Sequence, residues 1–471
     1  MTTARQVTLD VLNRSRARAG FAAELVDEAL TQGQLAPQDR RFVTQLVCGV
    51  IRRRGTLDAL VKPFIQRPPH TVEARVWDIL RLGAFQLAFL THIPPHAAVH
   101  ESVELATPAG VPQAKGFING VLRRVAELVT NDFCETAAAN TVPMDVTQDV
   151  LAPLRDSRSR ADTTRPPGRY RVLTQPVLPD PTSDFASYYA TAFSFPRWLT
   201  ARWLARYGAD ECTRLGFWFN SPPPLWIRVN KLRSRRENYR LQLTASGIDA
   251  EPGQHPQSLR LRDHIPIRDL PGFDSGEWTV QDHSSMLVAS AVGVQPGQHV
   301  LDLCAAPGSK TTHLAELMDN RGHITACDID DKRLKQVTAL CQRLGVGSVE
   351  TVLLTESGGI PPGPFDAALV DVPCSNTGVM NRRPEVRWRL KPREFEHLIR
   401  LQTRLLIEAV TRVRPGGAVV YSTCSIEPEE NEGVVKVVRQ ALRGVMLEAD
   451  HVAVPGQPSD GGYWARLRVA K

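Results

Sequence analysis

The stretch HVLDLCAAPGSKTTHLAELM, residues 299–318, decides the fold class of this chain. It opens with a short apolar run, turns through small residues, and then carries apolar residues at helical spacing. Three further apolar runs follow it, each separated from the next by a helical stretch: HITACD (323–328), FDAALVDV (365–372) and GAVVYSTC (417–424). Such alternation is typical of a parallel sheet covered by helices, and it predicts an α/β domain over residues 286–471.

All four apolar runs end in polar or thiol side chains. The carboxyl ends of parallel strands meet at one edge of a sheet, and ligands bind beyond that edge. We therefore expect the chemistry of this protein to converge on four strand ends: Asp302–Cys304, Asp328, Asp371–Cys374 and Thr423–Cys424.

The sequence before this domain divides into three parts. Residues 1–130 carry apolar residues at helical spacing, broken by Gly or Pro, and predict a compact helical domain. Residues 131–190 are rich in Pro, Ser, Thr and Asp without a sustained period, so we predict a linker or insertion. Residues 191–285 mix one helical stretch with short strand candidates and predict a small α+β subdomain.

Composition excludes several classes of protein. No apolar run approaches the ~18 residues of a membrane span, and the N-terminal residues lack the apolar core of a secretory signal, so we expect a cytoplasmic protein. The eight cysteines include no Cys-x-x-Cys pair, which argues against a structural metal site. The net charge is +7, and the basic excess lies in residues 1–130 and 190–270. Two basic regions suggest that the partner is a polyanion.

The turn after the first predicted strand has the composition of a small-molecule binding loop. It consists of Cys304, Ala305, Ala306, Pro307, Gly308, Ser309 and Lys310. Small residues let the backbone approach a ligand, and the N-terminus of the following helix favours a carboxylate or phosphate. The loop matches neither the GxxxxGK[ST] nor the GxGxxG pattern. With Asp328 placed to bind ribose hydroxyls, it suits S-adenosylmethionine, which carries a ribose and a small zwitterion.

Two cysteines at neighbouring strand ends, Cys374 and Cys424, indicate a reaction that needs a thiol. Carbon-5 of cytosine is too weak a nucleophile to take a methyl group directly. A thiolate that adds to carbon-6 makes carbon-5 nucleophilic, and a base must then remove the carbon-5 proton. An acid such as Asp371 suits the amidine edge of the ring. The residues alone leave open which thiol adds.

The motifs around these residues resemble those of the Nol1/Nop2/Sun family of RNA cytosine-5 methyltransferases. In the C-terminal half they are IRVN (227–230), GEWTVQDHSS (276–285), DLCAAPGSKT (302–311), DVPCSNTGVMNRRPEVRW (371–388), YSTCSIEPEENEGVV (421–435) and GGYWARL (461–467). The N-terminal part is similar to NusB-type RNA-binding domains, through DRRFVTQLVCGVIRRRGTLD (39–58), RLGAFQLAFLTHIPPHAAVHESVELA (81–106) and GFINGVLRR (116–124). The resemblance leaves out residues 131–190. It implies a Rossmann-like methyltransferase domain that acts on 16S rRNA.

The resemblance also implies roles for individual residues. It makes Cys424 the nucleophile, assigns Cys374 to product release, and places Lys310 near the catalytic site. The loop 304–310, Asp328 and Asp371 are implied to contact S-adenosylmethionine.

This sequence departs from the family pattern at two cofactor positions. Ser309 stands where the family has Gly, and a side chain there is strained if the position requires a positive φ. Glu356 is the nearest acid to a family Asp that contacts the adenine edge.

For RNA contacts we expect charged and hydrogen-bonding side chains in the IRVN and NRRPEVRW segments, suited to an extruded base or a single strand. They are Arg228, Asn230, Arg382, Arg383 and Arg387. We expect a monomer without a metal. Three alternatives remain: the same chemistry on tRNA, an assembly factor that binds RNA without catalysis, and a DNA methyltransferase.

Overall fold

The computed structural model describes residues 3–17, 21–33, 35–144, 169–262, 265–355 and 358–470. It forms two compact units. The N-terminal unit contains Met1–Pro223 together with the segment Met380–Arg389. The C-terminal unit contains Pro224–Val379 and Leu390–Lys471.

The N-terminal unit begins with seven α-helices in its described residues. They are α1 (Ala4–Ala17), α2 (Ala22–Gln32), α3 (Pro37–Arg52), α4 (Arg54–Val61), α5 (Ala74–Phe89), α6 (Pro95–Glu104) and α7 (Lys115–Leu128). Helix α5 is buried along nearly its whole length. Gly49 of α3 faces Phe85 of α5, where a Cβ would lie only 2.0 Å from the ring, so its lack of a side chain allows this packing. The predicted helical domain is confirmed.

A three-stranded antiparallel sheet follows, with strand order β1-β3-β2. Its strands are β1 (Val129–Cys134), β2 (Thr141–Pro143) and β3 (Tyr170–Leu173). The prediction of a linker over residues 131–190 is therefore wrong at both ends. Buried apolar side chains such as Val142 and Leu173 stabilise these short strands. The average composition of the region resembles a linker and does not reveal them. Residues 145–168 lie outside the described part of the chain.

Two helices complete this unit, α8 (Phe185–Ala192) and α9 (Arg197–Asn220). Helix α9 is kinked at Gly208, which has a φ of 77°. The predicted α+β subdomain, residues 191–285, includes α9, but the structure places α9 in the N-terminal unit. A periodic helical pattern shows that a helix forms, and does not show which domain it packs against. Segment Met380–Arg389 adds the short helix α14 (Val386–Arg389) to the same unit.

The C-terminal unit contains a small antiparallel sheet, in the order β5-β6-β4-β7. Its strands are β4 (Leu225–Val229), β5 (Ala250–Pro252), β6 (Ser258–Leu261) and β7 (Trp278–Val280). Helix α10 (Arg236–Ala245) packs on this sheet through the buried side chains of Tyr239 and Leu243. This is the predicted α+β subdomain without its first helix.

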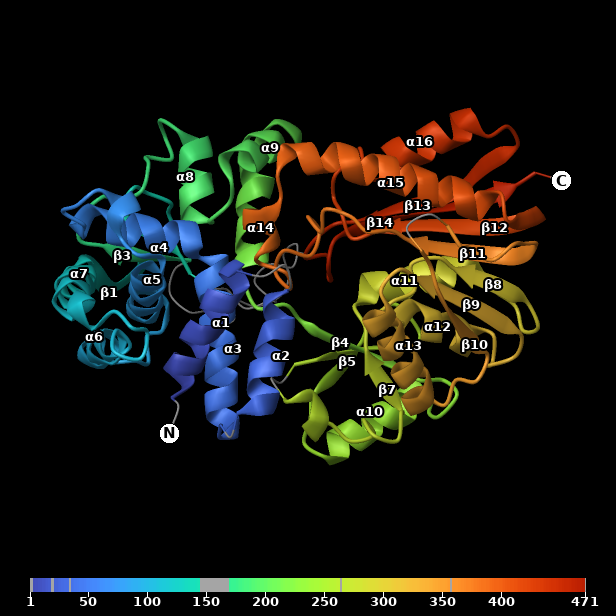
Figure 1. Ribbon diagram of the computed structural model, residues 1–471, viewed down its shortest axis with the longest axis horizontal. Helices are drawn as coiled ribbons and strands as arrows, with labels where there is room; N and C mark the ends of the chain where they lie inside the picture. The colour runs from blue at the N-terminus through green and yellow to red at the C-terminus, as the bar shows by residue number, and fades with distance from the viewer. Residues whose placement is uncertain are drawn as a thin grey trace, which may run out of the picture. The chain divides into compact units, whose positions relative to one another are not determined.

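The main sheet of the C-terminal unit has seven strands in the order β10-β9-β8-β11-β12-β14-β13 (Figure 1). They are β8 (His299–Asp302), β9 (His323–Asp328), β10 (Val349–Leu353), β11 (Phe365–Asp371), β12 (Val413–Thr423), β13 (Val445–Ala453) and β14 (Gly462–Val469). Strands β8 to β12 are parallel, as predicted, whereas β14 runs antiparallel to both of its neighbours, β12 and β13. The sheet is therefore mixed.

Helices cover both faces of the main sheet (Figure 1). They are α11 (His283–Val292), α12 (Ser309–Leu317) and α13 (Asp331–Leu344) on one face, and α15 (Pro392–Val410) and α16 (Glu432–Ala441) on the other. Successive side chains of β11 alternate between the two cores, with Ala367 and Leu369 on the α11–α13 face and Ala368 and Val370 on the other. This alternation explains why a strand buried on both faces reads as a continuous apolar run.

In the part of the chain that the structure describes, no helix combines the length and apolar character that a membrane span requires.

Candidate active site

Strands β11 and β12 bring the two cysteines together. Their parallel register pairs Asp371 with Ser422, so the chain continues from both strand ends at the same level of the sheet. Three residues beyond Asp371 lies Cys374, and two residues beyond Ser422 lies Cys424. Their Sγ atoms are 2.8 Å apart.

The two thiols have different surroundings. Cys374 is buried, and burial together with the Cys424 sulfur raises its pKa well above the ordinary value. Cys424 is half-buried and donates to Oδ1 of Asn376 at 3.1 Å. Asn376 adopts a left-handed backbone with a φ of 57°, a conformation that Asn tolerates better than most residues. Cys424 is therefore the more accessible thiol, and Cys374 stays protonated behind it.

Lys310 and Asp371 form an ion pair beside the thiols. Lys310 lies in the first turn of α12, and its Nζ is 2.7 Å from Oδ2 of Asp371. Ser422 donates from Oγ to the other carboxylate oxygen at 2.9 Å. Burial opposes the charge on Lys310, but the attraction of Asp371 and Cys424 outweighs it, so the pKa of Lys310 is raised. The ammonium is charged at neutral pH.

A small cavity of about 90 Å³ opens at this edge of the sheet. Its wall includes Lys310, Asp371, Ser422 and Cys424, whereas Cys374 is not among the lining residues. The Cys424 thiol, the Asp371 carboxylate and the Lys310 ammonium thus border the same space.

Asp328 and the loop before α12 form a second part of the site. Asp328 is buried at the end of β9, and its carboxylate accepts from the backbone N–H of Ala306 at 3.2 Å and of Asp330 at 3.1 Å. The positive φ of this loop belongs to Gly308, at 104°, where a Cβ would press on the backbone of Val337 at 3.1 Å. Ser309 is the first helical residue of α12. The departure from Gly at that position therefore causes no backbone strain.

Asp302, at the end of β8, has an unpaired carboxylate oxygen. Oδ2 accepts from Oγ1 of Thr311 at 2.7 Å, but Oδ1 has no hydrogen-bond partner although the side chain is only 1% exposed. Burial, with the nearby Asp371 and Asp328 charges, raises the pKa of Asp302 to about 7. A buried acceptor without a donor fits a ligand that supplies one, such as the ammonium of an amino acid.

Three family models match this chain. Residues 289–459 match the model described as 16S rRNA methyltransferase RsmB/F, residues 2–127 match the NusB family, and residues 195–268 match the RsmF/B-like ferredoxin-like domain. A probable ribosomal RNA small subunit methyltransferase B from Synechocystis is 34% identical over 441 residues, which cover 93% of this chain and 89% of the relative. This chain belongs to the RsmB/F family of methyltransferases.

Two further likenesses agree with this assignment to the RsmB/F family. A protein from Bacillus subtilis with the same name is 31% identical over 92% of this chain and 87% of its own length. The crystal structure of PH0851 covers 99% of this chain and 98% of its own, with a TM-score of 0.76. At 22% sequence identity, this second likeness shows the shared fold.

The cofactor of the RsmB/F family is S-adenosylmethionine, and the residues at the strand ends fit it. Asp302 offers a buried acceptor for the amino group, and Asp328 ends β9 where an acid binds ribose hydroxyls. Gly308 lets the loop backbone approach the ligand. Glu356, the predicted adenine contact, lies outside the described residues.

Three of the predicted RNA contacts are buried within this RsmB/F family member, and their side chains bind protein instead. Arg228 is fully buried and paired with Glu316 of α12 at 2.7 Å. Asn230 donates from Nδ2 to the backbone oxygens of Gly276 and Leu344, both at 2.9 Å. Arg387 is fully buried in the N-terminal unit, where it donates to Oδ1 of Asn220 at 2.8 Å. These predictions are corrected, because a side chain without exposed surface cannot contact RNA.

The other two predicted RNA contacts, Arg382 and Arg383, are half-buried in the N-terminal unit. The guanidinium of Arg383 stacks over the ring of Phe21, 4.0 Å from its centroid. An arginine on an aromatic face keeps part of its surface accessible. Arg382 and Arg383 therefore stay predictions for RNA contact.

Sequence reasoning missed Ser422 and Asn376, which contact the predicted catalytic side chains Asp371 and Cys424 directly. Both stand inside motifs that point to the cysteines. Their contacts depend on the pairing of β11 with β12. The local sequence of neither strand indicates that pairing. For Ser422, the only available signal was its position two residues before Cys424.

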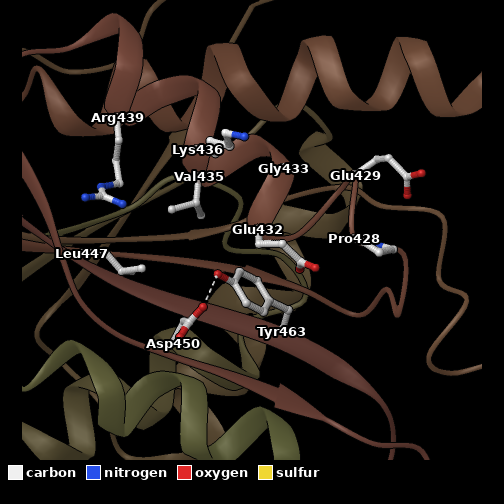
Figure 2. Close-up of a pocket in the computed structure, with 10 residues that line it drawn as sticks. All are labelled: Pro428, Glu429, Glu432, Gly433, Val435, Lys436, Arg439, Leu447, Asp450 and Tyr463. Atoms are coloured by element: carbon white, nitrogen blue, oxygen red, sulfur yellow. Dashed lines mark hydrogen bonds between the residues drawn. The ribbon is translucent and has the colours of Figure 1, made fainter. Parts of the chain in front are cut away.

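A larger cavity of about 470 Å³ lies against α16, away from the thiols (Figure 2). Figure 2 shows Tyr463 and Asp450 in its wall, joined by a hydrogen bond of 3.1 Å. The residues that line it include neither cysteine, nor Lys310 or Asp371. Volume alone therefore does not identify the cavity that holds the predicted catalytic residues.

Proposed function

We propose that this protein methylates carbon-5 of a cytosine in 16S rRNA, with Cys424 as the nucleophile. One observation carries the proposal. Cys424, Asp371 and Lys310 line a single small cavity at the carboxyl ends of β8, β11 and β12. The names of the related proteins support rRNA of the small subunit as the substrate.

The thiol makes the target carbon reactive. A thiolate on Cys424 adds to carbon-6 of the cytosine and forms a sulfur–carbon bond, which turns the ring into an enamine with a nucleophilic carbon-5. When bound, S-adenosylmethionine supplies an electrophilic methyl group. After transfer, a base removes the proton from carbon-5, the sulfur–carbon bond breaks, and Cys424 leaves as a thiolate.

Lys310 and Asp371 prepare the cavity for this addition. The attraction between Lys310 and Cys424 raises the pKa of the lysine, and the same attraction favours a negative charge on the sulfur. The Asp371 carboxylate is held by Lys310 and Ser422, so it faces the cavity in a defined orientation. A carboxylate there accepts hydrogen bonds from the amidine edge of cytosine and stabilises the adduct.

Cys374 acts after the methyl transfer in this proposal. Its Sγ lies 2.8 Å from that of Cys424, outside the cavity wall, so it does not compete for carbon-6. A thiol beside the bond that must break is positioned to assist release of the methylated base.

Bisulfite sequencing of 16S rRNA, from cells with and without the gene, tests the proposal. We expect one cytosine to lose its methyl mark without the gene. An unchanged 16S rRNA would contradict the proposal. Bisulfite sequencing of tRNA from the same cells would then identify tRNA as the substrate, and no change in either RNA would favour a role in ribosome assembly without catalysis.

A further inference from the structure

We infer that Glu430 is a positioning residue. It fixes the loop after β11 that carries Cys374 (the Cys374 loop) relative to the loop after β12 that carries Cys424 (the Cys424 loop). The inference rests on the proposed function of the two cysteines. Glu430 lies in the loop between Cys424 and α16, and its side chain is 0% exposed. None of the reaction steps above uses this carboxylate.

On one side the carboxylate binds the residue that follows Cys374. Oε1 of Glu430 accepts from the backbone N–H of Ser375 at 2.9 Å, and Oε2 accepts from the hydroxyl of the same serine. Gln402 of α15 donates from Nε2 to Oε1 at 2.9 Å and to the backbone oxygen of Pro373 at 3.0 Å. The Cys374 loop is thus held on both sides of the cysteine, by Glu430 at Ser375 and through Gln402 at Pro373.

On the other side the carboxylate binds the residue that follows Cys424. Ser425 donates from Oγ to Oε2 of Glu430 at 2.5 Å. The hydroxyls of Ser375 and Ser425 are themselves 3.1 Å apart. The Tyr421 hydroxyl of β12 donates to the backbone oxygen of Glu430 at 2.5 Å. One carboxylate is therefore the shared acceptor for the residues after both cysteines.

The donors to this carboxylate are neutral, so its orientation depends on their geometry. Bonds from neutral N–H and O–H groups to a buried carboxylate are strong and directional. The negative charge of Glu430 also contributes to the raised pKa of Cys374. Glu430 acts from outside the catalytic cavity, because it is not among the residues that line it.

Glu430→Gln tests the inference, because it keeps the shape and removes the charge and part of the acceptor capacity. The matched control is Glu432→Gln, two residues along the chain. Glu432 is exposed and faces the larger cavity (Figure 2). Both variants are compared with the wild-type full chain in thermal unfolding, S-adenosylmethionine affinity and methyl transfer.

For Glu430→Gln we expect kcat to fall by about 10- to 100-fold, since displacements near 1 Å have such effects. The dissociation constant of S-adenosylmethionine should stay within about twofold, because the loop 304–310 is held by other contacts. We expect Glu432→Gln to match the wild type in kcat and in the dissociation constant of S-adenosylmethionine.

The geometry is measured separately, without RNA, through the rate at which diamide closes a Cys374–Cys424 disulfide. Diamide accepts two electrons and the two thiol protons, and peptide mass mapping identifies the pair. We expect a rate in Glu430→Gln at least about threefold below that of the wild type, and an unchanged rate in Glu432→Gln. If the wild type shows no methyl transfer, the proposed function is refuted, but the rate of disulfide formation can still be measured.

Equal kcat and equal crosslinking rates in Glu430→Gln and the wild type would overturn the inference. A fall in kcat accompanied by equal loss of cofactor affinity would also overturn it, since that pattern indicates general damage. If Glu430→Gln does not fold, Ser425→Ala replaces it, because it removes the hydroxyl that joins the Cys424 loop to Glu430. The same slower crosslinking is then expected, and a wild-type rate in Ser425→Ala would overturn the inference.

Discussion

Cys374 and Cys424 occupy equivalent places in the sequence, each just beyond an apolar run, but the structure makes them chemically different. Cys374 is buried, and its raised pKa keeps it protonated. Cys424 lines the cavity and lies close enough to Lys310 for the lysine charge to favour a thiolate. Nucleophilic character therefore depends on burial and on a neighbouring cation.

We predict different outcomes for the two alanine variants. Cys424→Ala should reduce methyl transfer to background, because no thiol remains in the cavity to add to carbon-6. Cys374→Ala should still form the adduct but release it slowly. Denaturing electrophoresis with labelled RNA would detect that covalent complex. An active Cys424→Ala enzyme would contradict the assignment of roles.

A second prediction at the residue scale concerns pH and Asp302. An acid whose pKa is higher in the folded state holds its proton more tightly when folded, so it stabilises the fold at low pH. This contribution is lost as the pH rises from about 4 towards the folded pKa of about 7. Asp302→Asn is neutral throughout, so its melting temperature should rise relative to the wild type between pH 5 and pH 8.

Ligand-free protein and differential scanning fluorimetry suffice for this comparison. The exposed Asp274 offers a matched control, because Asp274→Asn removes one carboxylate from a solvent-exposed position. A melting-temperature difference between Asp302→Asn and the wild type that does not change with pH would contradict the prediction.

At the scale of elements, α12 links the cofactor loop to the small sheet. The Arg228 guanidinium on β4 donates to Oε1 of Glu316 near the end of this helix and to the backbone oxygen of Ser309 at its start. Both side chains of the ion pair are fully buried. The helix that carries Lys310 is thus anchored at both ends by one arginine.

We predict that Arg228→Met lowers the free energy of unfolding of the C-terminal unit by about 3–5 kcal/mol, because it leaves the buried Glu316 carboxylate without its compensating positive charge. Arg228→Met combined with Glu316→Leu should recover most of this loss. Chemical denaturation measures both. A variant with wild-type stability and weaker RNA binding would restore Arg228 as an RNA contact.

At the scale of the whole molecule, the chain leaves the C-terminal unit after Val379 and returns at Leu390. The segment between them belongs to the N-terminal unit, although it directly follows the Cys374 loop. Within that unit, Arg387 donates to the backbone oxygens of Arg52 at 3.0 Å and Phe219 at 3.1 Å. This segment makes the fold of the N-terminal unit depend on residues late in the chain.

We predict that Arg387→Met destabilises the N-terminal unit by at least about 3 kcal/mol, since it leaves several buried acceptors unpaired. Hydrogen exchange, resolved by mass spectrometry, should show faster exchange in α3 and α9. The half-buried Arg383 provides the comparison, because Arg383→Met should leave exchange in both helices nearly unchanged. Equal exchange in Arg387→Met and the wild type would contradict the prediction.

The sequence alone was sufficient to predict the helical domain, the α/β alternation and the four strand ends with their chemistry. These features depend on local patterns, because apolar spacing sets the type of each element and polar residues mark where a strand ends. The two cysteines and Asp371 could be named from these strand ends, whereas Lys310 was named near the catalytic site through the family resemblance.

Tertiary structure alone decided which of the conspicuous side chains reach the site. Arg228 and Arg387 have the charge expected of RNA contacts, but packing buries both. Glu430 is one of several acids in its motif, and only the pairing of β11 with β12 places it between the two cysteine loops. Burial and strand pairing join residues far apart in the chain, so no local pattern encodes them.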